Sequence, residues 1–205
     1  MKIRSHLYAI IDPFAGHEPV ALARTLLDAG ARVIQLRLKN VTSREFLAAA
    51  RGIAPMCRDA GAMFIVNDRC DIAMLCDADG VHLGQNDIPI EAGRRLMGSK
   101  IIGISTSNVE LAKAAEAAGA DYIGFGPVYA GGLKNIAQGR GLEMLSAVRA
   151  AVKIPIVAIG GITEATVPDV LRAGADSAAI ITDIVKAPDI AAKVRSILAI
   201  ALPAR

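Results

Sequence analysis

Three polar side chains alternate with aliphatic ones in the stretch VIQLRLKN, residues 33–40. Gln35, Arg37 and Lys39 fall at every second position, which is the period of a β-strand whose two faces differ. If this strand is central, these side chains point into the protein, where two cations without a partner would be costly. A buried acidic side chain could neutralise them, but we expect a phosphate ligand to be their partner.

Two aspartates follow other apolar segments and could bind a metal ion. Asp68 comes directly after the run FIVN (64–67), and Asp87 closes the segment GQND (84–87) after the next run. On adjacent strands the two carboxylates would meet, and two carboxylates with a phosphorylated substrate are a usual Mg²⁺ site. The alternatives are a helix cap for Asp68 and an Asx-turn before Ile88-Pro89 for Asp87.

A phrase that recurs along the chain indicates the elements that must position these residues. In each copy a helical run ends at a glycine, which suits the left-handed position after a helix, and a short apolar run follows. The copies are DAGARVIQL (28–36), DAGAMFIV (59–66), DADGVHLG (77–84), AAGADYIGFG (117–126) and RAGADSAAII (172–181). Each copy predicts a helix followed by a strand.

Eight short apolar runs alternate with helical patterns along the whole chain. They are LYAIID (7–12), VIQLRL (33–38), FIVN (64–67), GVHLG (80–84), IIGIS (101–105), YIGFG (122–126), IVAIG (156–160) and AAIIT (178–182). Strict alternation of strands and helices predicts a parallel sheet. Eight units with similar junctions favour an α/β protein with a single (β/α)8 TIM barrel over an open doubly wound sheet.

Composition bounds the class of protein. The 205 residues are 53% hydrophobic and only 3% aromatic, so we expect one domain over residues 1–205 with an aliphatic core. The net charge of +3 and the lack of basic runs argue against nucleic-acid binding. No segment is long and apolar enough to span a membrane. Cys57, Cys70 and Cys76 lack paired zinc-type spacing, which favours reduced thiols and a cytoplasmic location. Whether the chain forms a homo-oligomer is left open.

Hydroxyl and glycine residues follow the later runs, where a barrel would place its active site. Ser105 could bind a phosphate, or its segment could cap the next helix. The loops after the seventh and eighth strands commonly bind phosphate in barrels, although a Gly-Gly pair also suits close helix–strand packing. The residues in these segments are Ser105, the loop GPVYAGGLKN (126–135) with Lys134, Gly160, Gly161, Ile181 and Thr182.

No protein nucleophile is evident in the sequence. His82 lies inside the fourth apolar run between Val81 and Leu83, so we expect a core histidine. No Ser-His-Asp or Cys-His arrangement is present. Positioning and electrostatic stabilisation around an anion are therefore the expected chemistry.

Six segments together resemble the thiamine phosphate synthase family in their order and spacing. They are QLRLK (35–39), VND (66–68), HLGQND (82–87), GIS (103–105), GFGPVY (124–129) and AIGGIT (158–163), and the resemblance covers nearly the whole chain. It implies a (β/α)8 barrel that joins hydroxymethylpyrimidine diphosphate to thiazole phosphate and releases pyrophosphate with Mg²⁺. A related branch, the thiazole tautomerases, shares the fold.

The resemblance also implies roles for individual residues. Gln35, Arg37, Lys39 and Asn67 match residues that hold the pyrimidine diphosphate. Ser105 and Lys134 match further diphosphate contacts, and with Arg37 and Lys39 they form the implied catalytic set. Asp68 and Asp87 match the Mg²⁺ ligands. Gly161, Ile181 and Thr182 match the thiazole phosphate pocket, and Gly131 and Gly160 are further expected substrate-binding residues.

One segment departs from the family pattern. The family usually carries Thr-x-Thr before the lysine, whereas this chain has Gly131-Gly132-Leu133. We therefore expect weaker binding of the thiazole phosphate. A tautomerase is one rival interpretation, but that branch has a histidine where this chain has Pro127 and tends to lose the aspartate pair. The other rival is a non-catalytic protein that binds thiamine precursors.

Overall fold

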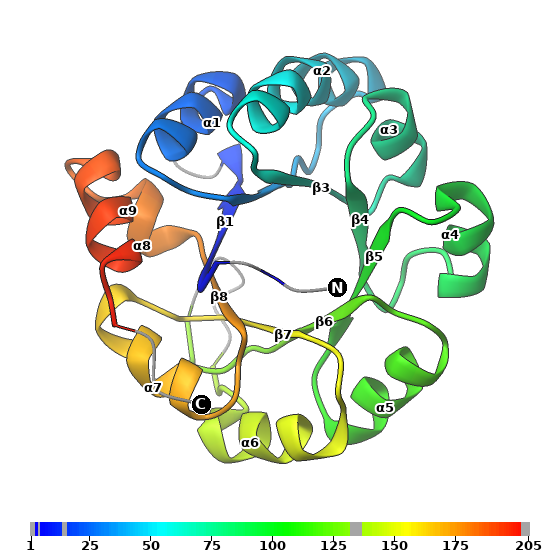
Figure 1. The fold of residues 1–205 in the computed structure, drawn as a ribbon, viewed down its shortest axis with the longest axis vertical. Helices are drawn as coiled ribbons and strands as arrows, with labels where there is room; N and C mark the ends of the chain where they lie inside the picture. Colours follow the sequence, from blue (N-terminus) through cyan, green and yellow to red (C-terminus); the bar gives the residue numbers. More distant parts are fainter. Residues whose placement is uncertain (1–2, 4, 14–15, 132–136, 202–205) are drawn as a thin grey trace.

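Eight parallel strands close into a barrel in the computed structural model, which describes residues 3, 5–13, 16–131 and 137–201. The strands follow one another around the barrel in sequence order, and the last pairs with the first (Figure 1). They are Leu7–Ile11 (β1), Val33–Leu36 (β2), Met63–Asn67 (β3), Gly80–Leu83 (β4), Ile101–Thr106 (β5), Tyr122–Phe125 (β6), Ile156–Ile159 (β7) and Ser177–Ile180 (β8). The predicted (β/α)8 barrel is confirmed, and the alternative of an open sheet is wrong.

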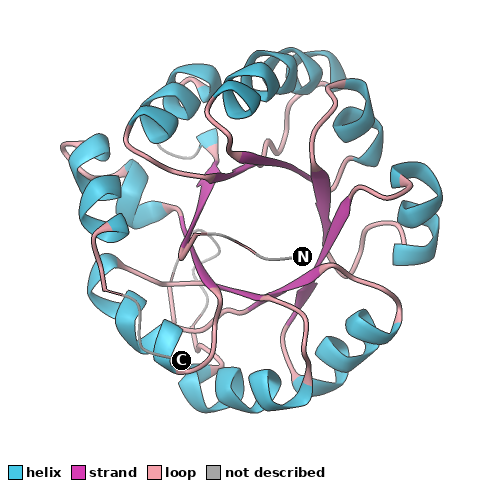
Figure 2. Ribbon diagram, viewed as in Figure 1, coloured by secondary structure: helices cyan, strands magenta, loops and turns pink. Residues whose placement is uncertain are grey.

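The helices form a ring around the outside of the strands (Figure 2). They are Pro19–Asp28 (α1), Ser43–Asp59 (α2), Cys70–Leu75 (α3), Ile90–Met97 (α4), Val109–Ala117 (α5), Gly141–Ala151 (α6), Val167–Arg172 (α7), Thr182–Val185 (α8) and Ile190–Leu198 (α9), with a 3₁₀ turn at Glu164–Thr166 (η2). Within the described ranges, no helix has the length and apolar composition needed to cross a membrane.

The recurring phrase places an aspartate just before a strand in three of its copies. Asp79, Asp121 and Asp176 precede β4, β6 and β8. Each carboxylate accepts an N–H from the start of the preceding strand in the sequence, and so it ties two neighbouring strands together at the base of the barrel. The donors are Phe64, Ile102 and Ile156, at 2.7, 2.9 and 2.8 Å. The repeat therefore encodes strand register as well as helix ends.

The alternating stretch behaves as its period predicts. Ile34 and Leu36 pack into the core between strands and helices, whereas Gln35 is 3% exposed and faces the barrel interior. β2 ends at Leu36, earlier than predicted, so Arg37 and Lys39 lie just beyond the strand. The N–H of Arg37 still donates to the carbonyl of Ile11 at 2.9 Å, which continues the pairing with β1. Both cations are therefore carried at the carboxyl end of the barrel.

Glycine at inward positions makes room for rings inside the barrel. A Cβ at Gly103 would lie 2.1 Å from Cζ of Tyr122, and one at Gly124 would lie 2.9 Å from Cε1 of His82. Tyr122 is only 1% exposed and packs with Tyr8 in the interior cluster. The rings of Tyr122 and His82 fit inside the barrel because Gly103 and Gly124 have no side chain at the positions that face them.

We expect Gly103→Ala to destabilise the protein by about 1–3 kcal/mol, the usual cost of overpacking a core. The added methyl group would collide with the ring of Tyr122, which is fully enclosed. Urea unfolding measures the change. In the control, Gly103→Ala/Tyr122→Ala, the cost should fall below the sum of the two single changes because the collision is gone. A Gly103→Ala variant as stable as the parent would contradict the packing argument.

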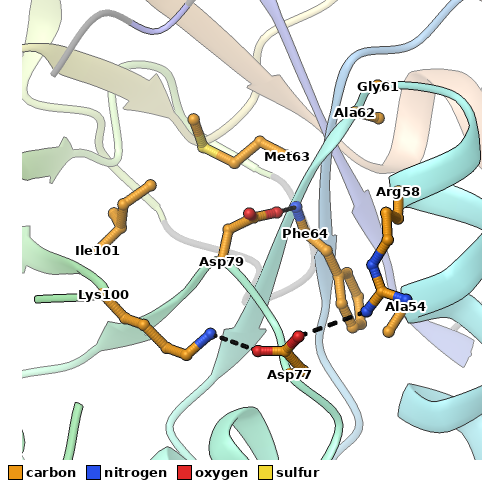
Figure 3. Close-up of a pocket in the computed structure, with 10 residues that line it drawn as sticks. All are labelled: Ala54, Arg58, Gly61, Ala62, Met63, Phe64, Asp77, Asp79, Lys100 and Ile101. Atoms are coloured by element: carbon orange, nitrogen blue, oxygen red, sulfur yellow. Dashed lines mark hydrogen bonds and ion pairs between the residues drawn. The ribbon is translucent and has the colours of Figure 1, made fainter. Parts of the chain in front are cut away.

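A second hollow, of about 400 Å³, lies at the opposite end of the barrel beside the first residues of β3 and β5. Figure 3 shows Asp77 between Lys100 and Arg58, whose nitrogens lie 2.8 and 3.5 Å from its carboxylate. Asp79 accepts the N–H of Phe64 in the same hollow. The acidic groups here have partners within the protein, so this end serves stability, as the base of a barrel usually does.

Candidate active site

A large pocket opens at the carboxyl ends of the strands. Its volume is about 1030 Å³, and residues from all eight strands or from the loops that follow them line it. Every predicted site residue that the structure describes lies on its wall: Gln35, Arg37, Lys39, Asn67, Asp68, Asp87, Ser105, Gly131, Gly160, Gly161, Ile181 and Thr182. Lys134, Gly132 and Leu133 lie outside the described residues.

Each of the two cations has a carboxylate partner. The guanidinium of Arg37 donates to Oδ2 of Asp12, and the ammonium of Lys39 donates to Oδ2 of Asp68. Asp12 follows β1 directly, and its side chain is only 9% exposed. The structure therefore shows the acidic alternative raised from the sequence, and the phosphate partner stays a prediction. The sequence does not mark Asp12 as the partner of Arg37, because Asp12 ends the first apolar run and lies 25 residues away along the chain.

The two predicted metal ligands lie together. Burial raises the pKa of Asp87, and a hydrogen bond with Asp68 and the charge of that carboxylate raise it further, against the lowering effect of a bond from Gly84 N–H. That bond is 2.7 Å long and turns Asp87 back toward β4, so it forms no Asx-turn with the residues that follow. The next helix, α3, begins at Cys70 after Arg69 and has no side-chain cap, so Asp68 does not cap it.

Asp68 is held in an uncommon backbone conformation. Its φ is +64°, in the left-handed region that residues with a side chain rarely adopt. Its N–H donates to the carbonyl of His82 at 2.8 Å, which anchors the turn to β4. Strain of this kind persists where the surroundings enforce it, often at functional sites.

The donor set of this site suits a hard cation that also binds a ligand. Among the described residues, no cluster of three or more His, Cys, Asp or Glu side chains is placed to hold a metal ion. The pair Asp68 and Asp87 would supply carboxylate oxygens, and the remaining positions would have to come from phosphate oxygens and water. Mg²⁺ is commonly bound in this way, because it keeps several waters and takes few protein ligands.

The loops after β6 and β7 pack on each other beside the pocket. Gly160 and Gly161 have φ values of +101° and +64°. A Cβ at Gly160 would lie 2.5 Å from Cβ of Pro127, and one at Gly161 would lie 2.6 Å from the carbonyl oxygen of Ala130. Close packing therefore requires both glycines, but against a loop and not against a helix as the alternative interpretation supposed. No hydrogen bond within the described chain engages the N–H groups of Gly161 and Thr182.

A chain of hydrogen bonds forms the floor of the pocket. Nε2 of Gln35 donates to the hydroxyl of Tyr8 at 2.8 Å, and that hydroxyl lies 2.8 Å from the hydroxyl of Tyr122. Nδ1 of His82 is 2.9 Å from Tyr122 Oη, and Nε2 of His82 is 2.9 Å from Ser105 Oγ. His82 is thus an interior histidine, as expected, but it also lines the pocket and contacts a predicted site residue. The sequence signal that could have identified the two tyrosines as pocket residues is their inward position on β1 and β6.

The fold and the pocket define a (β/α)8-barrel protein whose large pocket, at the carboxyl ends of the strands, is lined by cations, carboxylates and glycine loops. The sequence model of the family described as thiamine monophosphate synthase matches residues 7–184. The chain belongs to this family, and the resemblance noted in the sequence is confirmed.

Relatives in sequence and structure agree with this assignment. The chain is 46% identical to the thiamine-phosphate synthase of Moorella thermoacetica over 93% of its own length and 91% of that protein. It is 47% identical to the thiamine-phosphate synthase of Methanoculleus marisnigri over 93% and 92% of the two chains. The solved structure of thiamine phosphate pyrophosphorylase from Pyrococcus furiosus superposes with a TM-score of 0.87 at 36% identity, covering 94% and 93%.

Proposed function

We propose that residues 1–205 act as one barrel domain that condenses hydroxymethylpyrimidine diphosphate with thiazole phosphate, giving thiamine phosphate and pyrophosphate. Membership of the family supports this activity. The observation that carries the proposal is the meeting of Arg37 and Lys39 with the pair Asp68 and Asp87 at one pocket wall. Cations and a divalent-metal site side by side suit a diphosphate that must leave with its charge neutralised.

The chain's own residues would bind and orient the two substrates. Arg37, Lys39 and Ser105 would hold the diphosphate, with Lys134 from the neighbouring loop. Asn67 lines the same pocket and would contact the pyrimidine diphosphate. The bond between the pyrimidine methylene carbon and the diphosphate oxygen breaks with its electrons passing to the diphosphate, and the thiazole nitrogen then bonds to that carbon. The protein supplies no nucleophile in this scheme and works by positioning and by excluding water.

Asp68 and Asp87 would hold Mg²⁺. When bound, this ion supplies charge neutralisation to the leaving diphosphate. Asp68 also pairs with Lys39. Asp68 would then serve both the ion and Lys39, and Lys39 would also be able to donate to the diphosphate.

The thiazole phosphate would bind across the pocket, at the loops after β7 and β8. The N–H groups of Gly161 and Thr182 lie on the wall there. Backbone N–H groups in glycine turns form concave anion sites without needing a charged side chain. Gly160 and Ile181 shape the same wall.

Turnover of the two substrates tests the proposed function directly. Purified protein with both substrates and Mg²⁺ should form thiamine phosphate and pyrophosphate in equal amounts, and EDTA should stop the reaction. Isomerisation of a thiazole carboxylate phosphate in its place would support a tautomerase. Tight binding of either substrate without any product would support a precursor-binding protein.

Pyrophosphate with Mg²⁺ is expected to raise the melting temperature. A ligand at a hundred times its Kd stabilises the folded state by about 2.7 kcal/mol, which corresponds to roughly 5–10 °C for a domain of this size. Differential scanning fluorimetry measures the shift, with Mg²⁺ alone and sulfate as controls. Because Arg37 and Lys39 already have carboxylate partners, the gain comes from new contacts and not from relief of repulsion. No shift at any millimolar concentration would contradict the anion site.

The KM for thiazole phosphate is expected to exceed that for the pyrimidine diphosphate by about tenfold. Two threonine hydroxyls of the family pattern are absent, and hydrogen bonds to a charged group contribute about 1.5–3 kcal/mol each, partly offset by backbone N–H groups. Gly131 has a φ of +91°, so a threonine there would be strained and Gly131→Thr is no clean restoration. Leu133→Thr is the better test. In steady-state kinetics it should lower the KM for thiazole phosphate and leave the KM for the pyrimidine diphosphate unchanged. Equally low constants in the parent would show that the backbone replaces both hydroxyls.

A further inference from the structure

The hydrogen-bond chain on the pocket floor joins two proposed substrate contacts through three residues that have no assigned role. Gln35 and Ser105 stand at its ends, and Tyr8, Tyr122 and His82 connect them by four hydrogen bonds of 2.8–2.9 Å. All five side chains line the pocket. The ends belong to β2 and β5, on separate parts of the barrel wall, so their coupling would have to pass through the middle members.

Each middle member has one proton to donate along the chain. Burial raises the pKa of Tyr8 and of Tyr122, so both phenols keep their O–H. The two ring nitrogens of His82 lie 2.9 Å from the hydroxyls of Tyr122 and Ser105, and a neutral imidazole with one N–H and one bare nitrogen suits both neighbours. A phenol donates once, and a neutral imidazole donates from one side and accepts on the other. The chain therefore has a direction.

Two directions satisfy every member. In the first, Gln35 donates to Tyr8, Tyr8 to Tyr122, Tyr122 to Nδ1 of His82, and Nε2–H of His82 to Ser105. The carbonyl of Gln35 and the O–H of Ser105 then face the pocket. In the second, every bond is reversed, so the amide nitrogen of Gln35 and a lone pair of Ser105 face the pocket. In a mixture, one hydroxyl would accept from both of its neighbours, and its own O–H would be left without a partner among these residues, which is costly for a buried group.

We infer that Tyr8, Tyr122 and His82 are positioning residues that couple the hydrogen bonding of Gln35 to that of Ser105, so that the two pocket groups exchange donor and acceptor roles together. The chemical class of ligand rests on the proposed function. In the direction that begins with Nε2 of Gln35 donating to Tyr8, a ligand must offer a donor to Gln35 and an acceptor to Ser105. An aminopyrimidine ring that carries a diphosphate offers both, and the coupling rejects a ligand that satisfies one end alone.

The packing of the barrel interior holds the hydrogen-bonded side chains in place. The ring centroids of Tyr8 and Tyr122 are 6.1 Å apart, and those of His82 and Tyr122 are 5.5 Å apart. Gly103 and Gly124 leave the space that Tyr122 and His82 occupy. The rings therefore have little freedom to turn away from one another.

The tautomer of His82 reports the direction without any substrate, so this test is independent of the proposed activity. The nitrogen chemical shifts of labelled histidine should show Nε2–H in the parent. Gln35→Glu at alkaline pH places a carboxylate, which only accepts, at the end of the chain. The reversed direction is then enforced, and His82 should change to Nδ1–H.

The matched controls distinguish a reversal of the hydrogen-bond direction from a general structural effect of replacing Gln35. Gln35→Met offers no donor and only a weak acceptor, so it lacks the carboxylate that enforces the reversed direction, and His82 should keep Nε2–H. Adding Tyr8→Phe to Gln35→Glu cuts the chain, so the change should disappear. His6 and His17 are internal references because Nε2 of each lies 2.8 Å from a backbone carbonyl and must carry the proton. No change in Gln35→Glu, or a change that survives Tyr8→Phe, overturns the inference.

Kinetics provide a second measurement if Gln35→Glu does not fold. The effect of Gln35→Met on the KM for the pyrimidine diphosphate is compared in the parent and in Ser105→Ala. Independent sites agree within about twofold, whereas coupling should give a difference of about fivefold or more. Tyr122→Phe should abolish that difference. If the two effects of Gln35→Met, in the parent and in Ser105→Ala, agree within about twofold while Tyr122 is intact, the inference is overturned.

Discussion

Replacing Asp87 with asparagine is expected to reduce turnover by about a thousandfold or more, while the metal-free protein gains stability. A metal ion at a phosphoryl oxygen contributes several kcal/mol to transition-state stabilisation, and each 1.4 kcal/mol corresponds to about tenfold in rate. The asparagine can still accept the N–H of Gly84 and can donate to Asp68. It therefore keeps the local structure but removes one of two carboxylates that repel each other.

Turnover under limiting Mg²⁺ and thermal unfolding in EDTA measure the two effects of Asp87→Asn. Because burial raises the pKa of Asp87, the stability advantage of the variant should grow as pH rises through that raised pKa and vanish in acid, where the parent carboxyl is neutral. Asp71→Asn is the matched control, since Asp71 lies on α3 in an exposed ion pair with Arg69 and should change little. Full activity of Asp87→Asn would remove the aspartate pair from the reaction.

Arg37→Ala is expected to impair both folding stability and turnover, for different reasons. The side chains of Arg37 and Asp12 are 23% and 9% exposed, so the ion pair is largely enclosed. Removing one partner of a buried pair typically costs about 3–5 kcal/mol, because the other charge stays in a poorly solvated place. Turnover should fall by about a hundredfold or more, since guanidinium–phosphate hydrogen bonds are among the strong charge-assisted kind.

A second substitution separates the two effects of Arg37→Ala. Arg37→Ala/Asp12→Asn also removes the carboxylate charge that Arg37 neutralises in the parent, so urea unfolding should show most of the stability restored. The diphosphate still lacks its cation, so turnover should stay low and the melting response to pyrophosphate should stay weak. Recovery of turnover in the double variant would show that Arg37 acts only through Asp12 and does not hold the substrate.

Local patterns carried most of the information on the fold. The period of two in VIQLRLKN predicted which side chains face the barrel interior, and Gln35 lies there with Ile34 and Leu36 on the other side. Eight apolar runs that alternate with helical patterns predicted eight units, and the recurring helix–glycine–strand phrase marked five of the junctions. These signals are local because side-chain direction and helix ends depend on residues a few positions apart. The role of the aspartate in the phrase appeared only when the strands were paired.

The barrel, the family and most of the residues that line the pocket can be predicted from local sequence patterns. The pairing of these residues with one another depends on the closed tertiary structure. Asp12 neutralises Arg37 from a position 25 residues away, and Tyr8 meets Tyr122 across 114 residues of chain. Such contacts depend on the register at which eight strands close on themselves, and no local pattern encodes the distance between two strand ends. The hydrogen-bond partners on the pocket floor are therefore fixed by the closure of the barrel.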